Sequence, residues 1–315
     1  MTTPELDVLI VSYNVRPLLA ACLRSLYAHA AQEGVATRVL VVDNASGDGS
    51  PEMVAASFPH ASLLRSETNL GFPAGVNLGL RQLGYPDSPI RESPVLLLNP
   101  DTEVRPGALS LMLEDLSGLT RAGVIGPGLR YGDGAPQHAA FRFPGLAQVL
   151  LEFYPMNWRL TESRLNGRYG RQERGTRPYR CDHPLGAAML LRPSALQEVG
   201  LLDAGFFMYC EEVDWCWRAA KRGWLAWSDP RAIVVHYAGQ SASQSRGLMY
   251  VELWRSRYRL FAKHRGQSYL KAVRLIVRAG MALERVRARR ELRAGRLDSE
   301  GYGRLLAAYD AVSAL

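Results

Sequence analysis

Long apolar runs recur at regular intervals in the first third of the chain. The runs LDVLIVSY (6–13) and RVLVVDN (38–44) are rich in β-branched residues and lack polar alternation, which is typical of strands buried on both faces. ASLLRS (61–66) and PVLLLNPD (94–101) predict two further strands. Stretches with helical spacing separate them, such as AGVNLGLRQLG (74–84). This alternation predicts an α/β fold: a mostly parallel central sheet flanked by helices.

Two prolines support the helices between these strands. Pro17 is placed to open a helix, and Ser50 followed by Pro51 suits the N-cap and first position of the next. In a sheet of this kind, ligands bind beyond the carboxyl ends of the strands. The polar residues at those ends are therefore the candidates for a site: Ser12, Tyr13, Asp43, Asn44, Asn99 and Asp101.

The alternation of predicted strands and helices is lost between residues 131 and 182. This segment is rich in Gly, Pro and Arg, with seven arginines from Arg159 to Arg180, and one helix is expected near LAQVLLEF (146–153). Order returns with a strand and helix at 185–200, two strands at 224–229 and 232–239, and a helical tail from about Arg246. We therefore expect one domain over residues 1–240, with 131–182 as an irregular excursion, and a helical extension over 241–315.

The positive charge of the chain is concentrated in that extension. The net charge is +8, but from Arg255 to Leu315 there are 15 Lys and Arg against 5 Asp and Glu. On a helical wheel of 270–290, one arc of about 60° collects Lys271, Arg274, Arg278, Arg285 and Arg289. Leu270, Val273, Val277 and Met281 adjoin it, and Gly280 weakens the helix.

Such a helix has three possible uses. A basic amphipathic helix suits the surface of an anionic membrane. The alternative is a helix that packs on the rest of the protein and leaves its basic face in solvent. Nucleic-acid binding is not expected, because the chain has no RNA-binding motif or aromatic platform.

Composition indicates an ordinary globular protein, 47% hydrophobic and 22% charged. Its four cysteines (Cys22, Cys181, Cys210 and Cys216) form no CxxC pair and no zinc-ligand spacing, which favours free thiols in a reducing compartment. The start lacks the features of a signal peptide, and no apolar run approaches the ~18–20 residues of a membrane span. We expect a cytoplasmic protein, soluble or peripheral on the inner face of the membrane.

Three carboxylates in an apolar setting raise a question of chemistry. Glu211, Glu212 and Asp214 lie within FFMYCEEVDWCWR (206–218). Because burying an unpaired carboxylate costs several kcal/mol or more, something nearby needs negative charge or a proton acceptor. The alternative is that they form a solvated face of a helix.

Two strand ends could bind a cation or a nucleotide. Asp101, in LLLNPDTEV, is placed to hold Mg²⁺ or Mn²⁺ against a diphosphate, or simply to form a turn. Asp43, in VVDNASGDGS, could accept a hydrogen bond from a base or ribose or cap a helix, since the motif is neither GxGxxG nor a P-loop. His236 is a metal-ligand candidate only if its strand ends near Asp101.

Taken together, six motifs in order resemble a known family. IVSYNV, VVDNASGDGS, NLGFPAGVNLG, LLLNPDTEV, the long segment from Leu185 to Trp224 and VVHYAG are similar to the inverting family 2 glycosyltransferases of the GT-A fold. The nearest branch is the rhamnosyltransferase-like enzymes of cell-surface polysaccharide assembly. The resemblance covers roughly residues 6 to 240.

The resemblance implies roles for individual residues. Tyr13 and Asp43 match positions that contact the nucleotide base and ribose, with Ser12 beside them, while Asn69 and Asn77 line the donor side. Asp101 matches the last acid of the metal motif, which holds the donor diphosphate through Mg²⁺ or Mn²⁺, and His236 completes that site in some members. Asn99 stands where many relatives have Asp and can still bond the ribose or a metal-bound water. Glu212 aligns with the catalytic base, usually Asp; Glu211 or Asp214 could stand in.

The implied reaction is inverting transfer of a sugar from a nucleotide-diphosphate donor, with dTDP-L-rhamnose favoured. The implied acceptor is a glycan or a polyprenyl-diphosphate-linked sugar, and we expect the arginines from Arg159 to Arg180 to form an acceptor lid. One alternative is a sugar nucleotidyltransferase, but SYNVRPLL lacks the basic, glycine-rich loop that such an enzyme would carry. The other is a non-catalytic scaffold of a polysaccharide-assembly complex that retains the fold.

Overall fold

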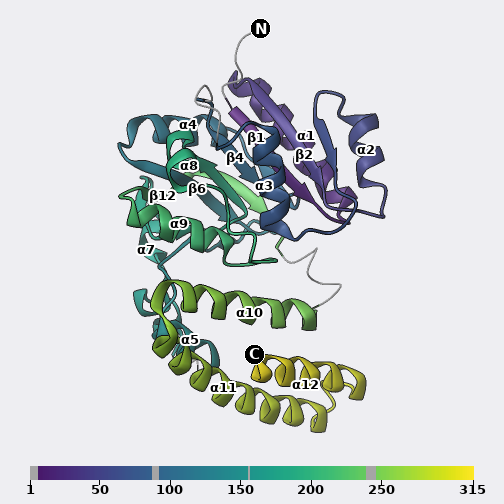
Figure 1. The fold of residues 1–315 in the computed structure, drawn as a ribbon, viewed down its shortest axis with the longest axis vertical. Coiled ribbons are helices and arrows are strands. Elements are labelled where there is room, and N and C mark those ends of the chain that lie inside the picture. The colour runs from purple at the N-terminus through teal and green to yellow at the C-terminus, as the bar shows by residue number, and fades with distance from the viewer. Residues whose placement is uncertain (1–5, 87–91, 155–156, 239–245) are drawn as a thin grey trace. The chain divides into compact units, whose positions relative to one another are not determined.

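The chain forms two compact units (Figure 1). The computed structural model describes residues 6–86, 92–154, 157–238 and 246–315. The first unit, which we call the sheet unit, comprises residues 1–143, 169–207 and 211–241. The second, the helical unit, comprises residues 144–168, 208–210 and 242–315. The domain boundary that we expected at residue 240 stays a prediction. In the structure, residues 144–168 and 208–210 group with the C-terminal helices.

A central sheet organises the sheet unit, with strand order β3-β2-β1-β4-β11-β6-β12-β5. Its strands are β1 (Leu6–Ser12), β2 (Thr37–Asp43), β3 (Ser62–Arg65), β4 (Val95–Leu98), β5 (Thr102–Val104), β6 (Ala122–Arg130), β11 (Ala188–Leu191) and β12 (Leu225–His236). The first four are parallel, and β6 pairs in parallel with β12. β11 runs antiparallel to both β4 and β6, and β5 runs antiparallel to β12.

Shorter strands extend this arrangement. β7 (Pro136–Gln137) pairs with β6, and β9 (Tyr179–Cys181) pairs with β12. β8 (Ala140–Phe141) and β10 (His183–Pro184) form a separate two-stranded sheet. The irregular segment predicted from the sequence therefore contributes short strands rather than a continuous layer.

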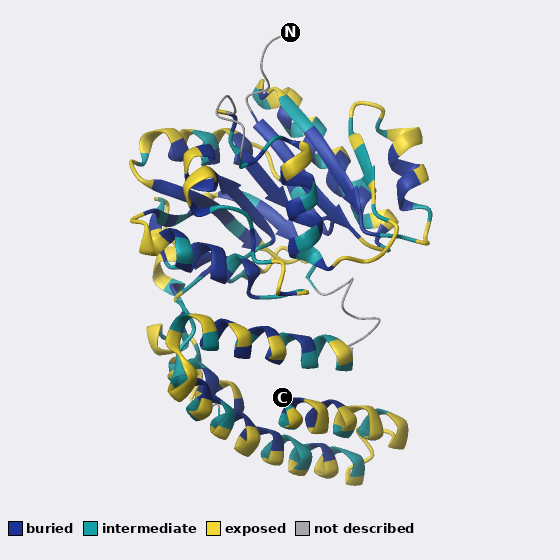
Figure 2. Ribbon diagram, in the orientation of Figure 1, coloured by how far each residue is buried: buried dark blue, intermediate teal, exposed yellow. Residues whose placement is uncertain are grey.

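Helices cover both faces of the sheet (Figures 1 and 2). They are α1 (Arg16–Glu33), α2 (Ser50–Ser57), α3 (Phe72–Gln82), α4 (Ala108–Gly118), α7 (Gly170–Glu173), α8 (Pro193–Val199) and α9 (Glu211–Lys221). In β1, Val8 and Ile10 belong to the core under α1, whereas Leu9 and Val11 belong to the core under α3. Burial on both faces explains why β1 reads as a continuous apolar run, and the predicted α/β architecture is confirmed.

Two glycines let α3 lie close to the sheet. A Cβ on Gly79 would meet Leu9 Cδ1 at 2.3 Å, and one on Gly75 would meet Val11 Cγ1 at 2.9 Å. Both distances are shorter than a carbon–carbon contact allows. The spacing of these glycines therefore brings the start of α3, at Phe72, close to the ends of β1 and β2.

The helical unit has a core of its own. It contains α5 (Leu146–Phe153), α6 (Trp158–Thr161), the 3₁₀ turn η1 (Arg164–Asn166), α10 (Arg246–Arg265), α11 (Gln267–Arg293) and α12 (Ser299–Ala314). The ring of Phe153 stacks on Trp254 with centroids 5.5 Å apart, and both side chains are buried. Because Phe153 helps to fill this core, α5 groups with the C-terminal helices. Among the helices in the described parts, none is long and apolar enough to cross a membrane.

Candidate active site

The ends of β1 and β2 place polar atoms side by side. Ser12 pairs with Asp43 in the register of the two strands. The Ser12 hydroxyl and Asp43 Oδ1 are both buried and have no hydrogen-bond partner within the described residues, while Asp43 Oδ2 accepts from the Ser46 amide at 3.0 Å. Buried polar atoms are rarely left unpaired. These two are therefore available to a hydrogen-bonding ligand.

The loops after β1 and β2 are tied together. The Asn14 amide donates to Ser46 Oγ at 3.0 Å, and the Gly47 amide donates to Asn14 Oδ1 at 2.8 Å. The Arg16 amide donates to Asp48 Oδ2 at 2.8 Å. Tyr13 precedes this network and keeps 43% of its surface exposed. Its exposed ring offers an apolar face on which a nucleotide base can stack.

Asn69 connects the end of β2 to the start of α3. Its Oδ1 accepts from Asn44 Nδ2 and from the Gly71 amide, both at 2.9 Å. The Phe72 amide in turn donates to the Phe207 carbonyl at 2.8 Å. Asn69 therefore positions the segment at 69–72 between β2 and the loop that precedes α9.

Asn77 lies deeper and makes two hydrogen bonds to one residue. Its Nδ2 donates to the Leu202 carbonyl at 2.8 Å, and its Oδ1 accepts from the Leu202 amide at 3.0 Å. The side chain is buried. These bonds indicate that Asn77 holds the loop after α8, and its position on the donor side stays a prediction.

Asp101 and His236 lie side by side where β5 begins and β12 ends. Strand β12 ends at His236, opposite Thr102 of β5, and His236 Nε2 lies 3.6 Å from Asp101 Oδ1. From the sequence, His236 was a metal-ligand candidate only if its strand ended near Asp101, and it does. Its other ring nitrogen, Nδ1, lies 3.2 Å from Gln137 Oε1. If Nδ1 carries the proton, Nε2 keeps its lone pair toward Asp101.

Burial favours the neutral form of both groups. It raises the pKa of Asp101 and lowers the pKa of His236, and the attraction between the two opposes each shift. Beside them, Asn99 Oδ1 is buried and has no hydrogen-bond partner in the described parts of the chain. Because a bound cation displaces the proton of a carboxyl ligand, Asp101 as carboxylate, the neutral imidazole of His236 and the amide oxygen of Asn99 make a donor set that suits a divalent cation.

The donor set fits a cation that brings further ligands with it. Among the residues with described placement, no group of three or more His, Cys, Asp or Glu could hold a metal ion. Two protein ligands are enough for Mg²⁺, which usually keeps waters and binds substrate phosphates. The 3.6 Å between Asp101 Oδ1 and His236 Nε2 is compatible with two ligands at about 2.0–2.2 Å from one ion.

The acidic residues of α9 differ in their surroundings. Asp214 is fully buried and accepts from Arg218 Nε at 2.8 Å. Arg218 also donates to the carbonyls of Val199 and Leu201. Asp214 therefore has a structural role: it fixes Arg218, which binds the end of α8 and the loop after it.

Glu211 and Glu212 begin α9, where the helix dipole favours negative charge. Each has a buried Oε2 with no hydrogen-bond partner among the described residues. Burial raises the pKa of both carboxyls, and the charge of Glu212 raises that of Glu211 further. The interpretation of these acids as a solvated helix face is therefore wrong for Glu211 and Asp214, which are buried.

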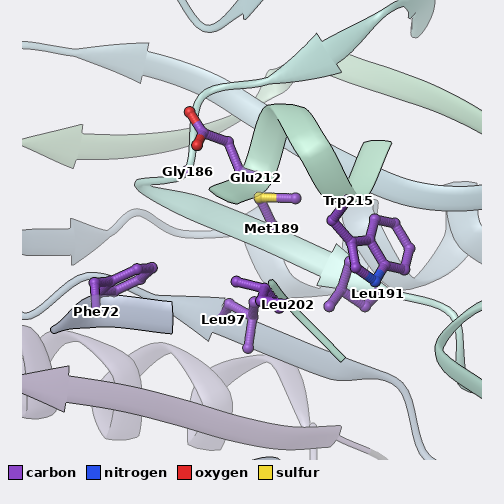
Figure 3. A pocket seen from close by; sticks show the side chains of 8 residues that line it. All are labelled: Phe72, Leu97, Gly186, Met189, Leu191, Leu202, Glu212 and Trp215. Carbon is purple, nitrogen blue, oxygen red and sulfur yellow. The ribbon is translucent and has the colours of Figure 1, made fainter. Parts of the chain in front are cut away.

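Glu212 lines a pocket whose other walls are mainly apolar, including Phe72, Met189 and Trp215 (Figure 3). Trp215 is fixed by a hydrogen bond from Nε1 to the Gly200 carbonyl at 2.9 Å. A Cβ on Gly186 would lie 3.4 Å from Glu212 Cγ, so the chain entering β11 passes directly beside the carboxylate.

That same chain segment links Glu212 to the cation ligands. The Ala187 carbonyl, next to Gly186, accepts from the Asn99 amide at 2.9 Å. Asn99 precedes Asp101 by two residues. The loop carrying Asp101 and the first turn of α9 therefore adjoin one short segment at 186–187, which brings the candidate base and the candidate metal ligands to the same edge of the sheet.

Comparison with known proteins shows the family to which the chain belongs. Residues 7–200 match the model of the family described as Glycosyl transferase family 2. The chain belongs to this family: it is a glycosyltransferase, and its fold is the GT-A fold, as the sequence resemblance implied.

Individual proteins within and beyond this family are similar to the chain. The chain is 32% identical over 290 residues to an N-acetylglucosaminyl-diphospho-decaprenol L-rhamnosyltransferase of Mycobacterium tuberculosis, covering 89% of this chain and 92% of that one. It is 27% identical to the low-salt glycan biosynthesis hexosyltransferase Agl10 of Haloferax volcanii, over 69% of this chain and 62% of the relative. Among solved structures, the mannosyltransferase PcManGT of Pyrobaculum calidifontis, in complex with GDP-Man and Mn²⁺, aligns with a TM-score of 0.58 at 17% identity, over 99% of this chain and 81% of that one.

Sequence reasoning missed the residues that position the site. Gln137, Asn14 and Arg218 hold functional candidates or their loops through hydrogen bonds. Arg218 could have been found, because it stands four residues after Asp214 and can pair with it on a helix. Gln137 lies 99 residues from His236, and nothing in the local pattern connects them.

Proposed function

We propose that this glycosyltransferase moves L-rhamnose from dTDP-L-rhamnose to an N-acetylglucosamine carried on a polyprenyl diphosphate. The observation that supports the reaction most is the approach of Glu212 and the Asp101 loop to one segment, residues 186–187. The donor and acceptor follow from the mycobacterial rhamnosyltransferase, which this chain matches over nearly the full length of both.

The residues at the strand ends would bind the donor. Tyr13 stacks on the base, while the Ser12 hydroxyl and Asp43 Oδ1 hydrogen-bond the nucleoside. Asn99 Oδ1 accepts from the ribose or from a cation-bound water. Asn69 and Asn77 shape the donor side by holding the segment at 69–72 and the loop at Leu202.

Asp101 and His236 would hold Mg²⁺ or Mn²⁺. A bound divalent cation offsets the negative charge that develops on the departing nucleoside diphosphate. Gln137 fixes the imidazole so that Nε2 faces this position. The structural relative in complex with Mn²⁺ supports a cation in this fold.

Glu212 would act as the general base. Its carboxylate takes the proton of the acceptor hydroxyl while that oxygen attacks the anomeric carbon from the side opposite the diphosphate, which inverts the configuration. A pKa raised by burial suits a base that works near neutral pH, and such catalysis contributes about 10²–10⁴-fold in rate. Glu211 remains the nearest stand-in, whereas Asp214 is held by Arg218.

We propose that the arginines from Arg159 to Arg180 contact the acceptor. Guanidinium groups bind phosphate oxygens with charge-assisted hydrogen bonds, and the proposed acceptor carries a diphosphate. Replacing Arg164, Arg171 and Arg174 by Ala should raise the acceptor KM more than the donor KM. An acceptor KM equal to that of the parent protein would refute this role.

The function is tested by supplying dTDP-L-rhamnose and a polyprenyl-diphosphate-linked N-acetylglucosamine with Mn²⁺. We expect a rhamnosylated product and one thymidine diphosphate per transfer. A non-catalytic scaffold would release no thymidine diphosphate, and a sugar nucleotidyltransferase would instead need a triphosphate and release pyrophosphate. Thermal shifts against a panel of nucleotide sugars would identify another donor if dTDP-L-rhamnose fails, because a specific ligand stabilises the folded state.

A further inference from the structure

One side of α11 exposes large apolar side chains to solvent. Leu275 keeps 72% of its surface exposed and Val286 keeps 48%. At 100° per residue, both fall within an arc of about 120° that, from Lys271 to Arg293, holds only apolar and basic residues; Ser268, in the first turn, falls in the same arc. We call this arc from Lys271 onward the outer face of α11; it comprises Lys271, Ala272, Leu275, Arg278, Ala279, Ala282, Val286, Arg289, Arg290 and Arg293. Figure 2 shows exposed positions recurring along this helix.

The packing of the helical unit does not use this face. The opposite side of α11 supplies the core with Leu270, Val273, Val277 and Met281. Gly280, on that same side, receives the ring of Phe153: a Cβ there would meet the ring at 2.3 Å. The helix is thus anchored in the helical unit from this side, and no residue of its outer face belongs to that core.

The structure also separates the basic residues into two sets. Arg274 lies over the ring of Tyr258, 5.4 Å from its centroid, and Arg285 donates to Asp310 Oδ1 at 2.7 Å. Both interactions are within the helical unit. Lys271, Arg278 and Arg289 are exposed. Two of the five cations that the helical wheel grouped together therefore serve packing, and three remain on the surface.

Within α11, no carboxylate lies on the outer face. The two acidic residues of α11, Glu284 and Glu291, lie roughly opposite it on the wheel. They pair with Arg287 and Arg296. The face therefore presents five cations along about 33 Å of helix, at 1.5 Å per residue, and its charge is complementary to a negatively charged surface.

The apolar residues indicate which kind of negative surface fits. Leu275 and Val286 stand between the cations rather than apart from them, so a ligand that offers phosphate alone would leave them in water. A bilayer surface offers both environments, because headgroup phosphates meet the cations and the acyl boundary meets the apolar side chains. A free phosphate or a nucleic acid backbone offers only the first.

We propose that the outer face of α11 docks on an anionic lipid bilayer. This inference deepens the proposed function and rests on it for the lipid-linked acceptor, which would be held in the same bilayer. Because docking would depend only on the exposure and charge of this face, it can be tested without any sugar transfer.

The test is flotation of the full-length protein with vesicles. We expect binding to an equal mixture of phosphatidylglycerol and phosphatidylcholine, and none to phosphatidylcholine alone. The triple variant Lys271→Gln, Arg278→Gln, Arg289→Gln should bind about 100-fold more weakly, since each cation near an anionic membrane is worth about fivefold. The double variant Leu275→Ser, Val286→Ser keeps the charge and should bind at least about tenfold more weakly.

A charge-matched control separates the face from the net charge. Arg24, Arg81 and Arg222 are exposed cations of the sheet unit, and replacing all three by Gln should leave vesicle binding within about twofold of the parent, because docking depends on cations near the membrane. Circular dichroism should show that each variant is folded.

Four outcomes would overturn the proposal. They are a parent protein that ignores the anionic vesicles, a control that loses as much binding as the outer-face triple, a Leu275/Val286 double variant that binds like the parent, and a parent that binds an RNA oligonucleotide in preference to the vesicles. Thymidine diphosphate release is measured separately. Docking without release would refute the proposed function alone, and release without docking would refute this inference alone.

Discussion

The three acids of α9 show how neighbouring residues of one type acquire different roles. Asp214 is committed to Arg218, whereas Glu211 and Glu212 each keep a buried oxygen with no protein partner in the described parts of the chain. Of these two, Glu212 lines the pocket (Figure 3). Environment rather than residue type therefore distinguishes Glu212, the proposed base, from its neighbours.

Replacing Glu212 by Gln should remove the base and preserve the fold. We expect kcat to fall by about 10²–10⁴-fold, with the unfolding midpoint close to that of the parent. Asp214→Asn is the contrasting variant. It leaves Arg218 without its carboxylate and should cost stability first, by about 3 kcal/mol as measured by urea unfolding. A Glu212→Gln enzyme that turns over at the parental rate would contradict the assignment.

The rate should depend on pH through Glu212. A general base works only when deprotonated, so kcat/KM should rise with pH until the carboxyl has ionised. Because burial raises the pKa of Glu212 above its ordinary 4.5, the acid limb of the profile should lie above pH 4.5 rather than at it. Replacement of Glu212 by Gln should abolish that limb; a limb that persists unchanged would belong to another group.

Gln137 should matter to the cation and not to the fold. It holds His236 Nδ1 at 3.2 Å, and loss of such an orienting partner typically costs 10–100-fold in metal affinity. Gln137→Leu should therefore weaken Mn²⁺ binding by about that factor, measured by calorimetry in the presence of thymidine diphosphate. Replacement of the exposed Arg24 by Gln should leave the affinity unchanged. Equal affinity in Gln137→Leu would show that His236 needs no such support.

Among the elements, α11 combines a close contact with an open surface. Gly280→Ala gains helix propensity of about 1 kcal/mol, but the new methyl group would meet the Phe153 ring at 2.3 Å. That ring is 2% exposed and stacked on Trp254, so it cannot move aside cheaply. We expect the overpacking cost to exceed this gain and the variant to be destabilised by about 1 kcal/mol net.

Gly303 provides the matched control for this prediction. It lies within α12, where a Cβ would meet nothing within 4 Å. Gly303→Ala should therefore stabilise the protein, by about 0.5–1 kcal/mol in urea unfolding. Stabilisation of both variants would mean that Phe153 does not pack tightly on α11.

The sequence predicts elements well where periodicity is strong. The runs at 6–13, 38–44 and 94–101 coincide with β1, β2 and β4 to within a few residues, because strands buried on both faces are continuous in apolar residues. The apolar side of α11 was predicted from the spacing of Leu270, Val273, Val277 and Met281 on a helical wheel. The grouping of α5 with the C-terminal helices was not predictable, since it depends on Phe153 reaching Trp254 and Gly280, both more than 100 residues away.

For the molecule as a whole, the sequence identified the candidate residues but not their supports. Strand ends and the family resemblance gave Ser12, Asp43, Asp101 and Glu212. The contacts that hold them, such as Asn99 to Ala187 and Gln137 to His236, join distant parts of the chain and carry no local pattern. They follow only from the topology, in which β11 and β12 bring later segments between and beside the early strands.

The most direct test of whether Tyr13, Asp101 and Glu212 belong to one site is a crystal structure of the protein with thymidine diphosphate and Mn²⁺. We predict one anomalous peak for Mn²⁺ at about 2.0–2.2 Å from Asp101 Oδ1 and His236 Nε2, with the terminal phosphate on the side of Glu212 and the base on Tyr13. An ion held by other residues, or a nucleotide away from the ends of β1 and β2, would contradict this prediction.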